Sequence, residues 1–290
     1  MAKKLIPLAI AYDFDGTLAP GNMQERDFIP AIGMTTKAFW KEVSDQAKEH
    51  EADNILVYMG LMLEKARSNR VQVRKSDFEK YGKELSFFDG VLPWADDNGE
   101  NYKGWFDRIN TYGKESGVRV EHYIISSGIR EMVQGSPIAS KFKSIFASSF
   151  QYDHHGIATW PALALNYTTK TQYLFRINKG DLHVYDHKKI NDFVPKSERP
   201  IPFENMVFIG DGETDIPCFR LVKDQGGHSI AVYAPNGRGK KQRAQTLKKD
   251  GRVDYVTAAD YRDGGKLDQV IKGIIDKLSA DHHLNSICRD

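Results

Sequence analysis

The sequence predicts an α/β fold, in which a parallel sheet is covered by helices on both faces and interrupted by a mainly helical insertion. Strand-like apolar runs alternate with helical patterns after residue 100, which is typical of such a sheet. Residues 20–87 have a different, helical pattern. The chain has 290 residues, of which 40% are hydrophobic and 28% charged, so it can bury one large core and carry an additional smaller unit.

The first strand is expected at Leu5–Tyr12, an apolar run close to the start of the chain. Basic residues before this run give the start of the chain a weak similarity to a secretion signal. Cleavage after the run would remove the strand from the protein, so we interpret the run as the first core strand. A helical pattern at Trp105 precedes a strand that ends at Ile125. Further strands are predicted at Ser144–Ser148, Met206–Ile209, Ser229–Tyr233 and Val253–Val256, with helices near Asp215–Val222 and Lys266–Leu278.

Three helices are predicted within the insertion. Thr35 or Thr36 is expected to cap the first, Asp53 the second, and Ser76 with Glu79 forms a capping box for the third. The aromatic and methionine side chains of these helices recur at helical spacing. We expect this stripe to form the core of the insertion rather than a ligand pocket. It comprises Phe39, Trp40, Tyr58, Met59 and Met62.

Two carboxylates stand two residues apart directly after the first predicted strand, in the segment DFDGTL at 13–18. Residues i and i+2 of an extended chain point to the same side, so Asp13 and Asp15 can share one pocket. Gly16 permits a sharp turn at the strand end, where open α/β sheets place their ligands. Such a pair suits covalent catalysis, because one carboxylate attacks while its neighbour carries the proton.

Three more segments follow in order. The run YII at 123–125 ends in Ser126, Ser127 and Gly128; Lys170 follows a polar YTT segment; and MVFI at 206–209 ends in GDGETD at 210–215. With all four motifs in chain order, the sequence resembles the haloacid dehalogenase-like superfamily of hydrolases over residues 1–19 and 88–260. Phe146–Asp153 is similar to the short strand and hairpin of the phosphoserine-phosphatase-like branch.

The resemblance implies a doubly wound, Rossmann-like catalytic core at 1–19 and 88–290, with residues 20–87 as a mobile helical cap that selects the leaving group. It also implies a phosphatase that acts on small phosphomonoesters. Asp13 would attack phosphorus to give an aspartyl-phosphate, and Asp15 would be the general acid and base. An acid at position 15 favours phosphoryl transfer over dehalogenation, since a carbon–halogen bond needs no protonated leaving group.

Phosphate and metal ligands are implied in the same way. Ser126, the amides of Ser127 and Gly128, and Lys170 would stabilise the phosphoryl oxygens. Mg²⁺ would be held by the Asp13 side chain, the Asp15 carbonyl and Asp211, while Asp215 would hold a coordinated water or orient Lys170. Two alternatives stay open: a phosphotransferase or phosphomutase that uses the same residues, and a non-catalytic regulatory binder of a phosphorylated metabolite.

Other features indicate where the protein works and what it contacts. The formal net charge of +2 gives no reason to expect nucleic acid or a membrane surface as partner, and the expected partner is a small phosphorylated metabolite. Two distant cysteines, Cys218 and Cys288, favour a reducing compartment, so we expect a cytoplasmic protein. The basic run at 237–252 is interpreted as a loop and a solvated helix. The histidine pairs at 154–155 and 282–283 are not expected to bind metal. No feature of the sequence indicates the oligomeric state.

Overall fold

The computed structural model describes residues 5–95 and 98–287. Within these residues the main sheet has seven strands in the order β6-β5-β4-β1-β7-β8-β9. Its strands are β1 (Ile6–Tyr12), β4 (Val118–Ile129), β5 (Ser144–Tyr152), β6 (Ala158–Leu163), β7 (Met206–Gly210), β8 (His228–Tyr233) and β9 (Tyr255–Ala258). Neighbouring strands are parallel except at the β5–β6 edge, where the hairpin is antiparallel. The predicted α/β fold and the hairpin after the second motif are confirmed.

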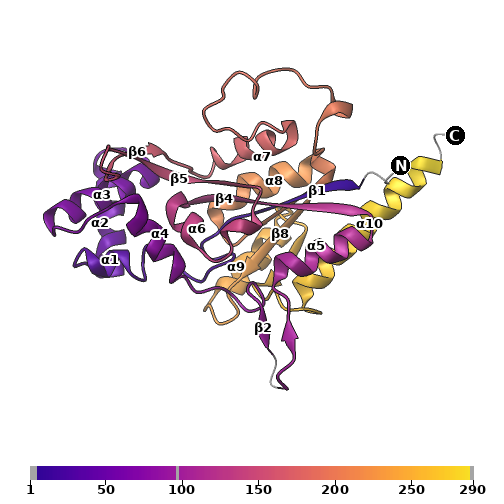
Figure 1. Ribbon diagram of the computed structural model, residues 1–290, viewed down its shortest axis with the longest axis horizontal. Helices are drawn as coiled ribbons and strands as arrows, with labels where there is room; N and C mark the ends of the chain where they lie inside the picture. The colour runs from indigo at the N-terminus through magenta and orange to yellow at the C-terminus, as the bar shows by residue number, and fades with distance from the viewer. Residues whose placement is uncertain (1–4, 96–97, 288–290) are drawn as a thin grey trace.

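Helices cover both faces of the sheet (Figure 1). Leu8, Ile10 and Tyr12 of β1 point to the face covered by α5 (Trp105–Glu115) and α10 (Lys266–Ile287). The alternate residues Ala9 and Ala11 point to the opposite face, which α7 (Lys170–Lys179), α8 (Ile216–Asp224) and α9 (Lys240–Lys249) cover. Because successive side chains of a strand alternate, the apolar run of β1 is buried on both sides.

The order of the strands fixes where a site can form. The chain runs from β1 outward through β4 and β5 to one edge, then crosses to β7 and continues through β8 and β9 to the other. Strand β1 therefore lies at the point where the order reverses, between β4 and β7. In open α/β sheets this is where a crevice forms at the carboxyl ends of the strands.

The insertion lies beside one end of the sheet, at the left in Figure 1. It contains α1 (Phe28–Ala31), α2 (Thr36–Glu49), α3 (Asn54–Ser68) and α4 (Lys75–Lys83). The Thr35 hydroxyl accepts a hydrogen bond from the Ala38 amide, and Asp53 caps α3 through the amides of Ile55 and Leu56. The two ends of the insertion meet where the Phe88 amide donates to the Leu18 carbonyl at 3.0 Å. The division into two domains at residues 20 and 87 stays a prediction.

The start of α4 differs from the prediction. The helix is capped at Arg74, whose amide donates to the Asp77 carboxylate at 3.1 Å, so the expected box of Ser76 and Glu79 is wrong. The reason lies outside the helix, because the neighbouring Lys75 amide donates to the Gly156 carbonyl in the β5–β6 turn. This tertiary bond starts the helix two residues earlier than the local pattern suggests.

Helix α4 packs closely on α6 (Arg130–Gly135), which follows the second motif (Figure 1). A Cβ atom at Gly82 would lie 2.0 Å from the Met132 carbonyl oxygen, and one at Gly135 would lie 2.0 Å from the Glu79 carbonyl oxygen. The two helices therefore approach through reciprocal glycines. This crossing holds the last helix of the insertion against the core.

The remaining elements lie away from the sheet edge that carries the motifs. Strands β2 (Trp94–Ala95) and β3 (Asn101–Tyr102) form a small separate hairpin.

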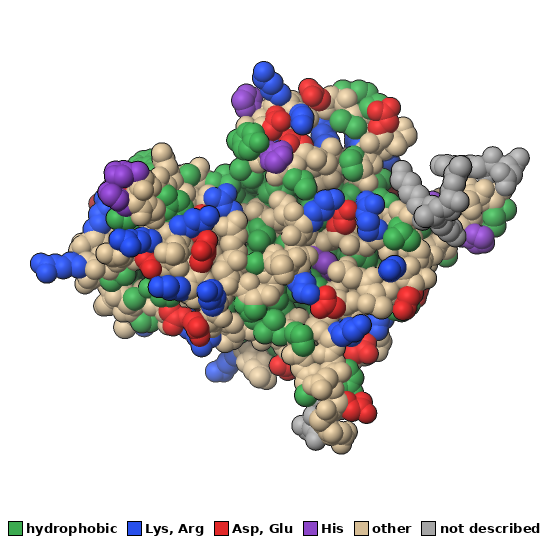
Figure 2. All heavy atoms as spheres, viewed as in Figure 1, with side chains coloured by type: hydrophobic (Ala, Val, Ile, Leu, Met, Phe, Trp, Pro, Cys, Tyr) green, Lys and Arg blue, Asp and Glu red, His purple; other side chains and the backbone are tan. Residues whose placement is uncertain are grey.

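Lys, Arg, Asp and Glu side chains are interspersed over the face shown in Figure 2. None of the described helices is both long and apolar enough to cross a membrane. Cys218 is buried, and Cys288 lies outside the described residues.

Candidate active site

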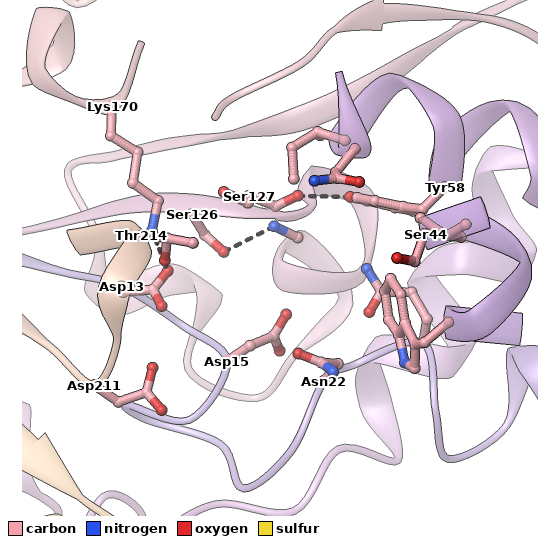
Figure 3. A pocket seen from close by; sticks show the side chains of 16 residues that line it. Asp13, Asp15, Asn22, Ser44, Tyr58, Ser126, Ser127, Lys170, Asp211 and Thr214 are labelled. Atoms are coloured by element: carbon pink, nitrogen blue, oxygen red, sulfur yellow. Dashed lines mark hydrogen bonds and ion pairs between the residues drawn. The ribbon is translucent and has the colours of Figure 1, made fainter. Parts of the chain in front are cut away.

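A cavity of about 410 Å³ lies at the carboxyl ends of β1, β4 and β7 (Figure 3). Seven of the eight residues predicted for the site line it: Asp13, Asp15, Ser126, Ser127, Gly128, Lys170 and Asp211. The eighth, Asp215, is fully buried behind Lys170 and contacts its ammonium group. Segments that are far apart in the sequence therefore converge here because parallel strands end at one edge of the sheet.

The loop after β1 is held tightly. The Asp13 amide donates to the Ile209 carbonyl of β7 at 2.9 Å, and the Phe14 carbonyl accepts from the amides of Leu18 and Ala19. Gly16 has a φ of +75°, and a Cβ atom there would lie 2.3 Å from an Asp211 carboxylate oxygen. Glycine at position 16 thus lets the first and last motifs approach each other.

Asp15 lies beside Asp13 in a setting that favours its protonated form. Burial and the charge of Asp13 raise the pKa of Asp15 well above its usual range, although the Met23 amide donates to its Oδ1 at 3.0 Å. Gly128 lies directly against this carboxyl group, since a Cβ atom at position 128 would be 2.9 Å from Asp15 Oδ2. Two neighbouring carboxyl groups, one of which has a strongly raised pKa, are the arrangement that a general acid needs.

Lys170 is the first residue of α7 and joins two of the acids. Its Nζ atom donates to Asp13 Oδ1 at 3.0 Å and to Asp215 Oδ1 at 2.8 Å, with only 1% of its side chain exposed. Burial alone would lower the pKa of Lys170, but the two carboxylates outweigh it and raise the pKa. Burial also raises the pKa of Asp13, and the Lys170 ammonium opposes this rise. The lysine is therefore charged, and it limits the rise in the pKa of Asp13.

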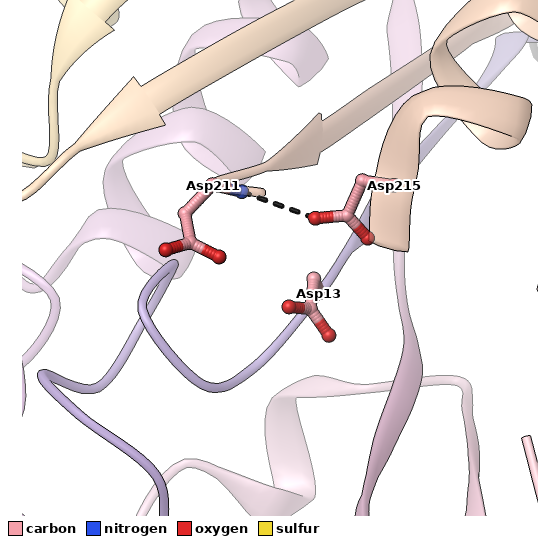
Figure 4. A group of neighbouring side chains, drawn as sticks. All are labelled: Asp13, Asp211 and Asp215. Carbon is pink, nitrogen blue, oxygen red and sulfur yellow. Dashed lines mark hydrogen bonds between the residues drawn. The ribbon is translucent and has the colours of Figure 1, made fainter. Parts of the chain in front are cut away.

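Asp13, Asp211 and Asp215 form the acidic cluster shown in Figure 4, in which one oxygen from each lies within 4.8 Å of the others. Asp215 belongs to the short turn of helix at Glu213–Asp215, and its Oδ2 accepts from the amides of Asp211 and Gly212 at 3.2 and 3.3 Å. Burial and Asp215 raise the pKa of Asp211. Crowded carboxylate oxygens are the donors that a hard cation such as Mg²⁺ takes, so the residues fit this ion.

The segment that was expected to bind phosphate lies at an irregularity near the end of β4, where the register with β5 shifts between Ser126 and Ile129. The Gly128 amide donates to the Ser126 hydroxyl oxygen at 3.0 Å, so this amide is engaged within the loop. The Ser127 carbonyl accepts from the Tyr58 hydroxyl of α3 at 2.6 Å. The hydrogen bond from Tyr58 joins the insertion to this loop.

Sequence reasoning missed several residues that line the cavity. From the insertion these include Asn22, Gln24, Trp40, Ser44 and Tyr58, and from the core Thr214. Trp40 and Tyr58 belong to the stripe that was expected to form core rather than a ligand pocket. Tyr58 packs in the core with Phe39 and Met59, and Trp40 packs against it, but Trp40 and Tyr58 also line the cavity. The polar residues stand in no motif, so no sequence signal could have identified them. Thr214 lies within the GDGETD segment. The sequence identified this segment as the last of the four motifs but gave Thr214 no role in it.

Charged residues of the insertion and its neighbourhood have other roles. Arg26, Arg67, Arg70 and Arg74 do not line the cavity. Arg26 instead donates to the Glu84 carbonyl and to the Ser86 hydroxyl. Lys240, the first residue of α9, was not predicted for the site, yet its Nζ lies 3.0 Å from Asp211 Oδ2. The basic run does form a loop and the helix α9, whose Ala244 is buried.

Comparisons with known proteins agree with this geometry. A sequence model of the haloacid dehalogenase-like hydrolases matches residues 10–220. An uncharacterized protein of Borreliella burgdorferi is 30% identical over 294 residues, which cover 90% of this chain and 93% of that protein.

Solved structures show the same fold at low identity. A phosphoserine phosphatase with an analogue of its phospho-aspartyl intermediate has a TM-score of 0.55 at 18% identity, covering 92% of this chain and 99% of that one. A substrate-bound phosphoserine phosphatase has a TM-score of 0.55 at 17% identity, covering 92% and 98%. A hydrolase of the same family from Salmonella enterica serovar Typhi has a TM-score of 0.50 at 19% identity, covering 81% of this chain and 66% of that one. Because the family model matches residues 10–220, the chain belongs to the haloacid dehalogenase-like hydrolase family.

Proposed function

We propose that the protein is a Mg²⁺-dependent phosphatase that hydrolyses a small phosphate monoester through an aspartyl-phosphate on Asp13. The observation that carries the proposal is the convergence of Asp13, Asp15, Ser126, Lys170 and Asp211 around one cavity. Fold neighbours that are phosphatases support it, as does the acidic cluster. A reducing, cytoplasmic setting stays our expectation.

The first half of the reaction is the transfer of the phosphoryl group to the enzyme. An oxygen of Asp13 attacks phosphorus and displaces the alcohol, whose oxygen receives a proton from Asp15. The raised pKa of Asp15 supports this role, because the group must carry a proton near neutral pH. Lys170 and the Ser126 hydroxyl stabilise the charge that develops on the phosphoryl oxygens.

The second half is hydrolysis of the aspartyl-phosphate. Asp15, now ionised, takes a proton from the attacking water. Inorganic phosphate is released, and the carboxylate of Asp13 is free again. Tyr58 and the other lining residues of the insertion cover one side of the cavity and so limit the access of solvent to the intermediate.

Asp13, the Asp15 carbonyl and Asp211 would hold the cation. When bound, Mg²⁺ would neutralise the negative charge that otherwise keeps a carboxylate away from a phosphate dianion. Both oxygens of Asp215 already accept hydrogen bonds, from Lys170 on one side and from the Asp211 loop on the other. We therefore propose that Asp215 orients Lys170 and the loop that carries Asp211.

Phosphate release from an activated aryl phosphate tests the proposal. We expect activity with Mg²⁺, none after chelation, and restoration when Mg²⁺ is returned. Asp13→Asn should abolish release while the circular dichroism spectrum is retained, and Asp224→Asn on the surface of α8 serves as the matched control. Substantial activity of the Asp13 variant, or full activity of chelated protein, would contradict the assignment.

A further inference from the structure

The cavity has two sides of different chemistry. In Figure 3, Asp13, Asp211 and Lys170 lie on one side, and Ser44 and Tyr58 of the insertion lie across from them. Asn22, Gln24 and Asn54 add three carboxamides to the side of the insertion. Among the described lining residues, the insertion contributes no charged side chain. This side meets the part of the substrate that leaves with the alcohol oxygen.

Gln24 is the most informative of these residues. It is 2% exposed, and its Oε1 atom has no hydrogen-bond partner among the described residues. The Ser127 hydroxyl oxygen, on the same cavity, is likewise buried without a partner. A buried amide or hydroxyl oxygen without a partner is unfavourable, so these atoms favour a ligand that brings hydrogen-bond donors.

Two carboxylates of the insertion, Glu25 and Asp53, are already engaged. Glu25 accepts from the Trp40 indole nitrogen at 2.8 Å and from the Asn22 amide group at 2.6 Å. Asp53 caps α3 and accepts from Asn166 at 2.9 Å. Lys170 is the one cation among the described residues of the lining, and it is paired with Asp13 and Asp215. A carboxylate on the leaving group would therefore be buried without a counter-charge, which is unfavourable.

Trp40 supplies a fixed apolar surface. Its ring lies edge to face with those of Tyr58 and Phe39, with ring centroids 5.8 and 5.2 Å apart. The indole nitrogen donates a hydrogen bond to Glu25. A rigid indole beside carboxamides and hydroxyls combines an apolar face with groups that both donate and accept. Alcohols with several hydroxyl groups have the same combination, since each hydroxyl donates and accepts and the carbon skeleton is apolar.

We propose that the leaving group is an uncharged, polyhydroxylated alcohol, so that the substrate is the phosphate of a sugar or polyol. Its hydroxyls bind the carboxamide of Gln24 and the neighbouring polar groups, and its carbon face packs on Trp40. This inference rests on the proposed phosphatase activity. A cavity of about 410 Å³ is in the size range of small-molecule sites and accommodates such a compound.

The first test compares kcat/KM of the wild type for four esters: a hexose 6-phosphate, phosphoserine, phosphocholine and an activated aryl phosphate as reference. We expect the hexose phosphate to exceed both phosphoserine and phosphocholine at least ten-fold. If either charged ester equals or exceeds it while the aryl phosphate is hydrolysed, the inference is overturned and the proposed function stands. If no ester is hydrolysed, the proposed function fails and the inference falls with it.

The second test uses Gln24→Leu, which removes the carboxamide at similar size. The ratio of kcat/KM for the hexose phosphate to that for the aryl phosphate should fall about ten-fold, as is typical when a buried partner of a substrate hydroxyl is lost. Taking the ratio within one variant cancels any loss of folded protein. Gln242→Leu, an exposed position of α9, is the matched control and should leave the ratio unchanged. An unchanged ratio in Gln24→Leu would overturn the inference.

Discussion

The Nζ atom of Lys170 lies 3.0 Å from Oδ1 of Asp13, although 157 positions separate the two residues in the chain. Asp215 accepts from the same ammonium at 2.8 Å, so one buried cation is shared by two buried carboxylates. Such a group is coupled, because loss of one member leaves the others buried without compensation.

Lys170→Met tests this coupling. In the presence of chelator we expect the free energy of unfolding to fall by about 3–5 kcal/mol, because two buried carboxylates lose their counter-charge. Urea denaturation monitored by circular dichroism measures the change. Lys241→Met, at an exposed position of α9, should change it by less than about 0.5 kcal/mol. Equal stability of the two variants would mean that Lys170 does not compensate the acids.

Lys240 is expected to compete with the cation for Asp211. Its ammonium lies 3.0 Å from Asp211 Oδ2, and 46% of the side chain is exposed. Lys240→Met should therefore tighten Mg²⁺ binding about five-fold, which corresponds to the ~1 kcal/mol of an exposed ion pair. Calorimetric titration with Mg²⁺ measures this, again with Lys241→Met as the control. Weaker binding by the Lys240 variant would show that the lysine supports the cation site instead.

His122, which packs against Phe106 of α5, makes folding sensitive to acid. Burial lowers the pKa of His122 from 6.5 to about 3, and its ring nitrogens contact the Tyr12 hydroxyl and the Asn110 side chain. The unfolded chain takes up this proton below pH 6.5, whereas the native protein does so only near pH 3. Stability from this group is therefore complete above pH 6.5 and is lost as the pH falls toward 3.

The measurement is the free energy of unfolding between about pH 6 and pH 4. His122→Gln should flatten its pH dependence by up to about 1.4 kcal/mol per pH unit, the contribution of one proton. His155→Gln changes an exposed histidine and should leave the slope as it is. Parallel curves for the wild type and His122→Gln would refute a neutral, buried His122.

The glycine crossing of α4 and α6 gives a prediction with an internal control. Gly82→Ala should lower the free energy of unfolding by about 1–3 kcal/mol, because the added methyl group meets the Met132 carbonyl and the helices must separate. Gly60→Ala in α3 meets no atom within 4 Å and should stabilise by about 0.5–1 kcal/mol through helix propensity. Thermal denaturation that ranks the two variants in the opposite order would rule out the close approach.

Much of the fold and of the candidate site could be predicted because both depend on local signals at strand ends. Asp13, Ser126 and Asp211 each follow or end an apolar run, and parallel strands bring such ends together. The predicted strands at Met206–Ile209 and Ser229–Tyr233 agree with β7 and β8 to within a residue. The strand expected at Val253–Val256 is shifted to Tyr255–Ala258 because its pairing with β8 sets the register.

Other features depend on contacts between distant segments, which no local pattern encodes. The Lys75 amide finds its acceptor in the β5–β6 turn, so the start of α4 could not be read from residues 74–79 alone. Gln24 and Asn54 are ordinary polar residues until the insertion folds against the core. Lys240 reaches Asp211 only because α9 follows β8 to the same edge of the sheet.

The central claim is that Asp13 is the nucleophile, and mapping of the phosphorylated residue tests it most directly. Asp15→Asn should accumulate the intermediate from an activated aryl phosphate, because formation needs no acid while hydrolysis lacks its base. After acid quench and hydroxylamine treatment, mass spectrometry of the peptides should find a hydroxamate at Asp13. Release of the aryl alcohol with the phosphoryl group on another residue, or with Asp13 unmodified during an observed burst, would contradict the account.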